Sequence, residues 1–140
     1  MKYLAVLGRV EKVCLAEVEA FFGGVKKIGK AAVFESDVCP EIDRFGGVLN
    51  FAEKLTAPPL EFLKDLPEGK ITIGVSDYSK NASKKTATME ALKLKKILVR
   101  HGRSVRTVEN KDAALSSATS LHNGLAGGNV KKIELIKLDK

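Results

Sequence analysis

The chain has 140 residues, of which 44% are hydrophobic and 29% charged, a mixture typical of a globular chain that forms one domain or two small ones. That composition excludes a disordered chain, and no apolar run approaches the roughly 18 residues of a membrane span. Residues 1–69 contain 9 Lys and Arg against 11 Asp and Glu (net −2), whereas residues 70–140 contain 15 against 6 (net +9). The positive excess therefore lies in the second half, which favours a polyanion as its partner.

The sequence of the first half predicts three strands and one helix, with a further short helix or loop. The apolar run Tyr3–Leu7 predicts a buried strand, and Val13–Phe22 predicts a helix with apolar residues at helical spacing, which ends at the glycine pair that follows. Val25–Phe34 predicts a second strand and Phe45–Leu55 a third. The polar stretch between them, Ser36–Arg44, predicts a short helix or a loop.

A domain boundary is expected after the third strand. Two consecutive prolines, Pro58–Pro59, interrupt regular structure there. Leu60–Leu66 predicts a short helix, and Pro67–Gly69 predicts a turn where the charge balance also changes. The expected domains are therefore residues 1–68 and residues 69–140.

The second half predicts alternating strands and helices. Lys70–Asp77 alternates Ile and Val with other residues and predicts a strand, and Lys84–His101 predicts an amphipathic helix. Ser104–Val108 predicts a strand, Ala113–His122 a helix and Lys132–Leu138 a final strand. The whole pattern favours an α+β chain made of two small domains.

The sequence offers no catalytic, metal or cofactor site. His101 ends the basic helix and His122 falls on the apolar-spaced face of the next one, so both are interpreted as structural residues. The glycine pairs Gly23–Gly24, Gly46–Gly47 and Gly127–Gly128 lack the third glycine of a dinucleotide-binding loop and predict turns. Cys14 and Cys39 have no Cys or His near them at metal-ligand spacing, which predicts two free thiols.

One group of residues does indicate a function. Nine cations lie within thirty residues, most of them on or beside the amphipathic helix, and phosphates are bound by cations held at such intervals. They are Lys84, Lys85, Lys93, Lys95, Lys96, Arg100, Arg103, Arg106 and Lys111. A solvated helix face would explain the lysines alone, and the two arginines after the helix favour nucleic acid.

Several stretches resemble a known family. Gly102–Ala118 together with Leu121–Leu125 looks like the THUMP-type RNA-binding region of tRNA guanine-N2 methyltransferases and related RNA methylases. The opening Tyr3–Arg9, the following Leu15–Ala20, and the glycine-containing Phe45–Val48 also fit that region. The resemblance covers nearly the whole chain.

The resemblance implies a ferredoxin-like N-terminal domain followed by a THUMP-like RNA-binding domain. In such enzymes this pair docks on the acceptor end of tRNA, and a separate domain methylates guanine with S-adenosylmethionine. Such a catalytic domain needs an Asn/Asp-Pro-Pro-Tyr/Phe motif, whereas the Pro-Pro pair here lies in Ala57–Leu60 and is interpreted as a kink. The expectation is a chain without catalytic residues, metal or cofactor of its own.

By the same resemblance, further residues become candidates for RNA contact. The further candidates are Arg103, Arg106, Lys111, Ser116, Ser117, His122 and Asn123. The expected site combines them with the helix cations Lys84, Lys85, Lys93, Lys96 and Arg100. The cations would pair with phosphates, and the serines lie near a helix start, where backbone N–H groups attract phosphate. For His122 and Asn123, capping the helix is an equally good reading, because Asn before Gly commonly ends a helix.

Cys14 departs from the family, which often has Ser at that position. A Ser there would form a capping box with Glu17, and Cys caps poorly, so the helix start is expected to be weaker by roughly 1 kcal/mol.

The expected function is therefore a tRNA-binding module that serves a separate methyltransferase domain or subunit. A homodimer is one possible state, and a cytoplasmic location follows from Gly8–Arg9, which ends the first apolar run too early for a signal peptide. The alternative is a protein-interaction module whose basic helix binds an acidic partner. A small-molecule enzyme of ferredoxin-like fold is a third and weaker reading.

Overall fold

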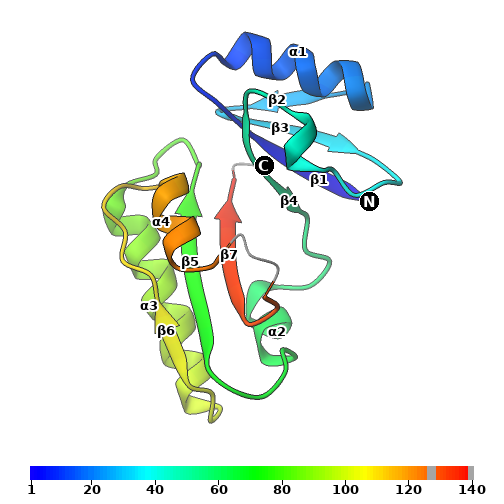
Figure 1. Cartoon of the computed structure of the whole chain (residues 1–140). Helices are drawn as coiled ribbons and strands as arrows, with labels where there is room; N and C mark the ends of the chain where they lie inside the picture. Colours follow the sequence, from blue (N-terminus) through cyan, green and yellow to red (C-terminus); the bar gives the residue numbers. More distant parts are fainter. Residues whose placement is uncertain (126–128, 139–140) are drawn as a thin grey trace. The chain divides into compact units, whose positions relative to one another are not determined.

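The computed structural model describes residues 1–125 and 129–138, so the turn predicted at Gly127–Gly128 lies outside the described residues. The chain divides into two compact units, Met1–Lys54 and Leu55–Lys140 (Figure 1). This division falls before the short helix α2 (Pro59–Lys64), whereas the sequence placed the boundary after it. The physical reason is Leu63 of α2, which is fully buried in the core of the second unit. No helix in the described part of the chain is long and apolar enough to cross a membrane.

The first unit is a four-stranded antiparallel sheet with one long helix, in the strand order β2-β3-β1-β4. Its elements are β1 (Lys2–Leu7), α1 (Glu11–Phe22), β2 (Lys26–Ile28), β3 (Ala31–Glu35), the single-turn helix η1 (Ile42–Arg44) and β4 (Val48–Glu53). The predicted strand Val25–Phe34 is two strands, because Gly29 takes a positive φ of 59° and turns the chain between them.

The helix α1 covers one face of this sheet. Cys14 and Val18, four residues apart, are buried against the alternate residues Tyr3, Ala5 and Leu7 of β1. An aromatic cluster extends this core at the end of α1, where the rings of Phe22 and Phe34 stack with centroids 4.3 Å apart.

Cys14 does not sit at the helix start, which corrects the expectation of a weakened cap. The helix α1 begins at Glu11, and the preceding Val10 makes no side-chain cap. Instead, the Cys14 Sγ donates a hydrogen bond to the Gly47 carbonyl at 3.0 Å, and the Gly46 N–H donates to Glu17 Oε1 at 3.0 Å. Cys14 and Glu17 therefore hold the turn that leads into β4.

The geometry of that turn predicts that replacing Gly46 and Gly47 with Ala affects stability very differently. A Cβ on Gly47 would lie 2.5 Å from Cys14 Sγ, whereas a Cβ on Gly46 would meet only Glu17 Oε2 at 3.8 Å. We expect Gly47→Ala to lower the free energy of unfolding by about 1–3 kcal/mol, and Gly46→Ala to have a much smaller effect. Urea unfolding of both variants measures the difference. Equal losses would show that the turn yields to the added methyl group.

The second unit is a three-stranded parallel sheet in the order β6-β5-β7 with helices on both faces. Its elements are α2 (Pro59–Lys64), β5 (Ile71–Asp77), α3 (Lys84–Arg100), β6 (Val105–Thr107), α4 (Ser117–His122) and β7 (Lys132–Lys137). The described residues combine two sheets and four α-helices, which confirms the α+β class at this coarse level.

The central strand β5 is buried along its whole length, and its two faces carry different helices. Ile71, Ile73 and Val75 pack against the apolar stripe of α3, which consists of Ala87, Ala91, Leu94 and Leu98. On the opposite face, a Cβ on Gly74 would lie 2.6 Å from both Leu115 and Leu125, so only glycine allows the segment around α4 to approach so closely.

The helix α4 is shorter than the predicted Ala113–His122. The Asp77 N–H donates to the Ala113 carbonyl at 2.9 Å, and the Leu115 N–H donates to Ser76 Oγ at 2.9 Å. These bonds to the end of β5 keep residues 113–116 out of the helix, which begins at Ser117.

Candidate nucleic-acid interface

The charge of the chain belongs to the second unit. Residues 1–54 contain 8 Lys and Arg and 8 Asp and Glu (net 0), whereas residues 55–140 contain 16 and 9 (net +7). Three ion pairs, Lys2–Glu35, Lys27–Glu11 and Arg44–Glu41, lie in the first unit. The second unit carries more cations than carboxylates, by seven charges.

One set of these cations lies on the outer side of α3 and is called the α3 surface. Its cations are Lys85, Lys93, Lys96 and Arg100, all exposed. Met89 and Val99, which are 60% and 52% exposed, lie among them. A face that mixes apolar side chains with cations differs from a purely solvated helix face.

A second set lies on the opposite face of the sheet, at the edge where the three parallel strands begin. The register pairs Thr72 of β5 with Arg106 of β6 on one side and with Lys132 of β7 on the other. Val105 and Ile133, the neighbours of these cations, pack in the α3 core. Because side chains alternate along a strand, Arg106 and Lys132 therefore both point to the α4 face.

The head groups of this row converge on the end of α4. Arg106 Nη2 donates to Asn123 Oδ1 at 2.6 Å, and Asn123 Nδ2 donates back to the Thr119 carbonyl at 2.9 Å. A Cβ on Gly124 would lie 3.3 Å from Lys132 Nζ, so the ammonium group lies against this glycine. Both cations face the C-terminal end of α4, whose dipole they offset, so they contribute to stability as well as to surface charge.

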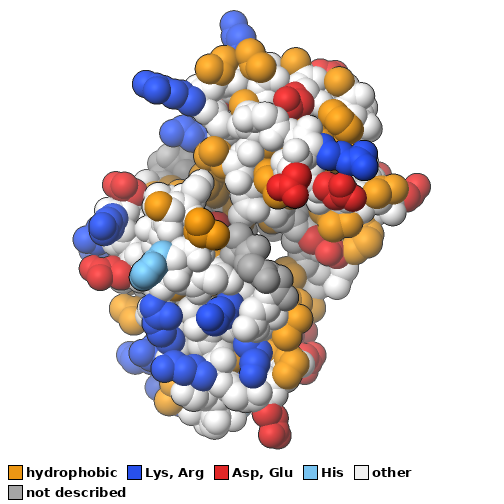
Figure 2. All heavy atoms as spheres, viewed as in Figure 1, with side chains coloured by type: hydrophobic (Ala, Val, Ile, Leu, Met, Phe, Trp, Pro, Cys, Tyr) orange, Lys and Arg blue, Asp and Glu red, His pale blue; other side chains and the backbone are white. Residues whose placement is uncertain are grey.

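Two more lysines extend this row. The Thr72 N–H donates to the Lys131 carbonyl at 2.8 Å, and a Cβ on Gly69 would lie 3.1 Å from Lys131 Nζ. Lys70, which is exposed, directly precedes β5 at the same edge. We call the whole set the amino-edge patch: Lys70, Arg106, Asn123, Lys131 and Lys132. Figure 2 shows Lys and Arg side chains gathered over the end of this unit where β5 and β7 begin in Figure 1.

The structure thus divides the predicted constellation. Arg106 and Asn123 meet at the amino-edge patch, while the four cations of the α3 surface lie across the sheet from them. Three residues of the patch, Lys70, Lys131 and Lys132, were not predicted. Parallel pairing brings the first residues of all three strands to one edge, so the signal was present in Lys131–Lys132, just before the last predicted strand.

Arg103 has a structural role that the sequence did not indicate. Its Nη1 donates to the Leu66 carbonyl at 2.7 Å and its Nη2 to the Pro67 carbonyl at 2.6 Å. Its Nε is buried without a partner among the described residues. The guanidinium group therefore fastens the turn between α2 and β5, and its two terminal nitrogens are already engaged.

We expect Arg103→Ala to lower the free energy of unfolding by about 1–3 kcal/mol, because two carbonyl groups lose their donors. Arg100→Ala removes the same side chain from the exposed end of α3 and should change stability by less than about 0.5 kcal/mol. Chemical unfolding of the two variants tests this. Equal stability would mean that the Arg103 hydrogen bonds are replaced by water without loss.

The remaining predicted residues near α4 also differ from expectation. Ser116 caps the helix, since its Oγ accepts from the Thr119 N–H at 3.1 Å, and Ser117 is the exposed first helical residue. His122 is exposed rather than on a buried face. The buried residue of α4 is Ser120, whose Oγ donates to Glu134 Oε1 at 2.5 Å.

Lys84 and Lys111 lie at the other edge of the sheet, where the strands end. Both are exposed, Lys84 as the first residue of α3 and Lys111 in the chain after β6. Between these segments lies Asp77, which is 3% exposed. Its carboxylate accepts from the Ser79 N–H at 2.9 Å and from Thr86 Oγ1 at 2.8 Å, so it braces the start of α3.

The pKa of Asp77 reflects this position. Burial alone would raise the pKa, but the hydrogen bonds from Ser79 and Thr86, with the charge of Lys137, outweigh it and hold the pKa below its ordinary value. A carboxyl group of this kind stabilises the fold fully above its unfolded-state pKa, and the contribution is lost as the pH falls through the folded-state value.

We therefore expect the free energy of unfolding to fall as the pH drops below about 4, and to fall less steeply in Asp77→Asn. At neutral pH the variant should be less stable by about 1–3 kcal/mol, because an amide cannot accept all of these hydrogen bonds. Urea unfolding at several pH values measures both effects. Parallel pH profiles for the two proteins would contradict the role assigned to Asp77.

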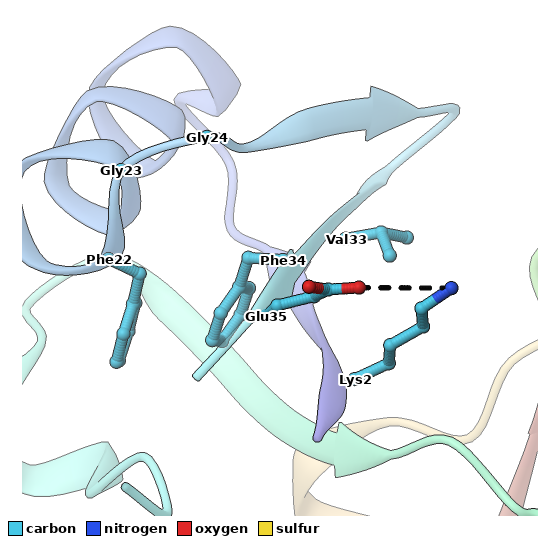
Figure 3. A pocket seen from close by; sticks show the side chains of 7 residues that line it. All are labelled: Lys2, Phe22, Gly23, Gly24, Val33, Phe34 and Glu35. Carbon is cyan, nitrogen blue, oxygen red and sulfur yellow. Dashed lines mark ion pairs between the residues drawn. The ribbon is translucent and has the colours of Figure 1, made fainter. Parts of the chain in front are cut away.

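The first unit offers a hollow of about 370 Å³ between the end of α1 and β3. Figure 3 shows the side chains that line it, with Lys2 and Glu35 pointing toward one another and Phe22 at the end of α1. The Lys2 Nζ lies 3.8 Å from Glu35 Oε1, and both side chains are mostly exposed. A surface ion pair of this kind contributes little, and the lining contains no Ser, Thr, Cys or His.

Within residues 1–125 and 129–138, no group of three or more His, Cys, Asp or Glu residues is placed to hold a metal ion. Comparison with family models, with curated proteins and with solved structures finds no match to this chain.

Proposed function

We propose that the chain is an RNA-binding protein and that the amino-edge patch is its RNA-binding surface. The observation that carries this proposal is the row Arg106–Thr72–Lys132, in which two cations flank a buried threonine across three paired strands. Neither cation forms an ion pair with a described residue. A phosphate backbone would supply the missing negative charge.

The two cations suit phosphate in different ways. Arg106 gives one donor to Asn123, and the rest of its planar guanidinium group remains available for two-pronged hydrogen bonding. Lys132 adds a point charge about 10 Å away, since adjacent strands lie about 4.8 Å apart. Asn123 acts as a positioning residue, because its own bond to Thr119 fixes the oxygen that holds Arg106.

The finer part of the proposal rests on the family resemblance. The expected RNA is tRNA, bound at its acceptor end. A separate S-adenosylmethionine-dependent domain would methylate guanine. The strand order β2-β3-β1-β4 and the helix between β1 and β2 are compatible with a ferredoxin-like first unit, with the second helix reduced to the single turn η1. The second unit would then be the THUMP-like domain.

The experiment is a filter-binding titration of the chain with folded tRNA at ~150 mM salt. We expect Arg106→Ala combined with Lys132→Ala to weaken binding by about 10-fold or more, and to reduce the dependence of affinity on salt. Lys93→Ala combined with Lys96→Ala removes the same number of charges from the α3 surface and should change affinity far less. Arg103 is left intact because its loss would disturb the fold.

The outcomes separate the levels of the proposal. Equal losses in the two double variants would mean that RNA binding reflects net charge, and no binding by the unaltered chain would reject the function. A tRNA without its single-stranded 3′ end and a duplex DNA test the finer part. If tRNA with and without that end bind alike, the acceptor-end assignment fails while RNA binding stands.

A further inference from the structure

A groove runs along the second unit on the side of α3 that faces β6. Its volume is about 220 Å³, and its lining comes from the first half of α3 and from residues 107–110. Ala91 and Val108 give it an apolar floor, and Leu92 stands at its rim with 50% of its surface exposed. The groove therefore has room and apolar surface for a side chain from another molecule.

The strand beside this groove is the edge of its sheet, because the order is β6-β5-β7. The Ser104 carbonyl and the Val108 N–H both bond to β5, at 2.9 and 2.8 Å. Backbone groups alternate in direction along a strand, so the N–H and C=O groups of Val105 and Thr107 point away from the sheet. Such outward groups can pair with one more extended chain.

The charge along the groove defines what kind of chain would fit. One side of α3 presents residues spaced by three and four, beside its buried stripe. They are Lys84, Thr88 and Leu92, which line the groove, and Lys95 and Val99, which continue this side of α3 beyond it. Two exposed apolar side chains thus alternate with two cations, which suits a segment whose apolar residues are flanked by carboxylates. Glu109 on the other wall keeps those carboxylates on the α3 side.

A buried acceptor lies at the far end of the groove. Asn110 is 2% exposed, and its Nδ2 donates to the Val75 carbonyl at 2.8 Å and to the Asp112 carbonyl at 3.3 Å. These two bonds fix the amide, and its buried Oδ1 has no donor among the described residues. Asn110 therefore gives this end of the groove a fixed polar wall.

We propose that this groove binds an extended acidic peptide from a partner protein, which pairs with the free edge of β6 and inserts an apolar side chain between α3 and residues 107–110. This function is separate from RNA binding, because the amino-edge patch lies on the opposite face of the sheet. The partner is defined by its chemistry: an extended stretch with Leu, Ile or Val flanked by Asp or Glu.

The test is a selection of phage-displayed random linear peptides on the intact chain, followed by titration of the enriched peptides at ~150 mM salt. We expect a consensus of an apolar residue flanked by acids. Thr107→Pro removes an outward N–H without touching the bonds to β5, and should weaken binding by about 10-fold or more. Leu92→Glu should do the same through the groove itself. Leu121→Glu places the same charge on a 76% exposed leucine of α4 and is the matched control.

Thermal unfolding of each variant establishes that it is folded, and Leu92→Glu keeps the test decisive should Thr107→Pro unfold. The proposal is overturned if no acidic–apolar consensus emerges, or if Leu92→Glu and Leu121→Glu bind the selected peptides equally. It is also overturned if folded tRNA displaces the peptides and Leu92→Glu weakens tRNA binding, because the groove would then belong to the RNA surface.

Discussion

The parallel pairing of β5 with β6 and β7 is the constraint on which the second unit depends. Parallel strands cannot be joined by tight turns, so each connection must cross the sheet, and here α3 and α4 cross on opposite faces. The same pairing brings the first residues of all three strands to one edge. Arg106 and Lys132 are neighbours of Thr72 for this reason alone, although Lys132 is far from both in sequence.

The face of β5 toward α4 is polar where the other face is apolar, and this difference positions the patch. Gly74 admits the chain around Leu115 and Leu125, and Ser76 accepts from the Leu115 N–H while donating to Glu134. These contacts fix the path of the chain into α4. The position of Asn123 at the end of that helix, and with it the orientation of Arg106, follows from bonds made at the opposite end of β5.

Local patterns predicted the elements well, and failed where a residue's partner lies far along the chain. The alternation in Lys70–Asp77 identified β5, and the apolar stripe of Lys84–His101 identified α3. Burial of one face places apolar residues at the period of the strand or helix, and the sequence shows that period. No local pattern distinguishes Arg103, which holds the carbonyls of Leu66 and Pro67, from Arg106, which faces solvent. Cys14 was likewise misassigned because its partner, Gly47, is more than thirty residues away.

The separation of the two cationic surfaces is itself a physical argument about function. A helix is about 10 Å across and packs about 10 Å from a sheet, so the α3 surface and the amino-edge patch are roughly 20 Å apart. At physiological salt the Debye length is ~8 Å, so a phosphate backbone bound at one surface is largely screened from the other.

Net charge raises the rate of encounter with RNA from any side, but the contacts that hold it must come from one surface. Met89 and Val99 lie exposed among the cations of α3, and desolvating an apolar side chain stabilises contact with protein more than contact with phosphate. Under the two proposals, RNA would bind at the start of the strands while α3 and the edge of β6 remain open to a protein.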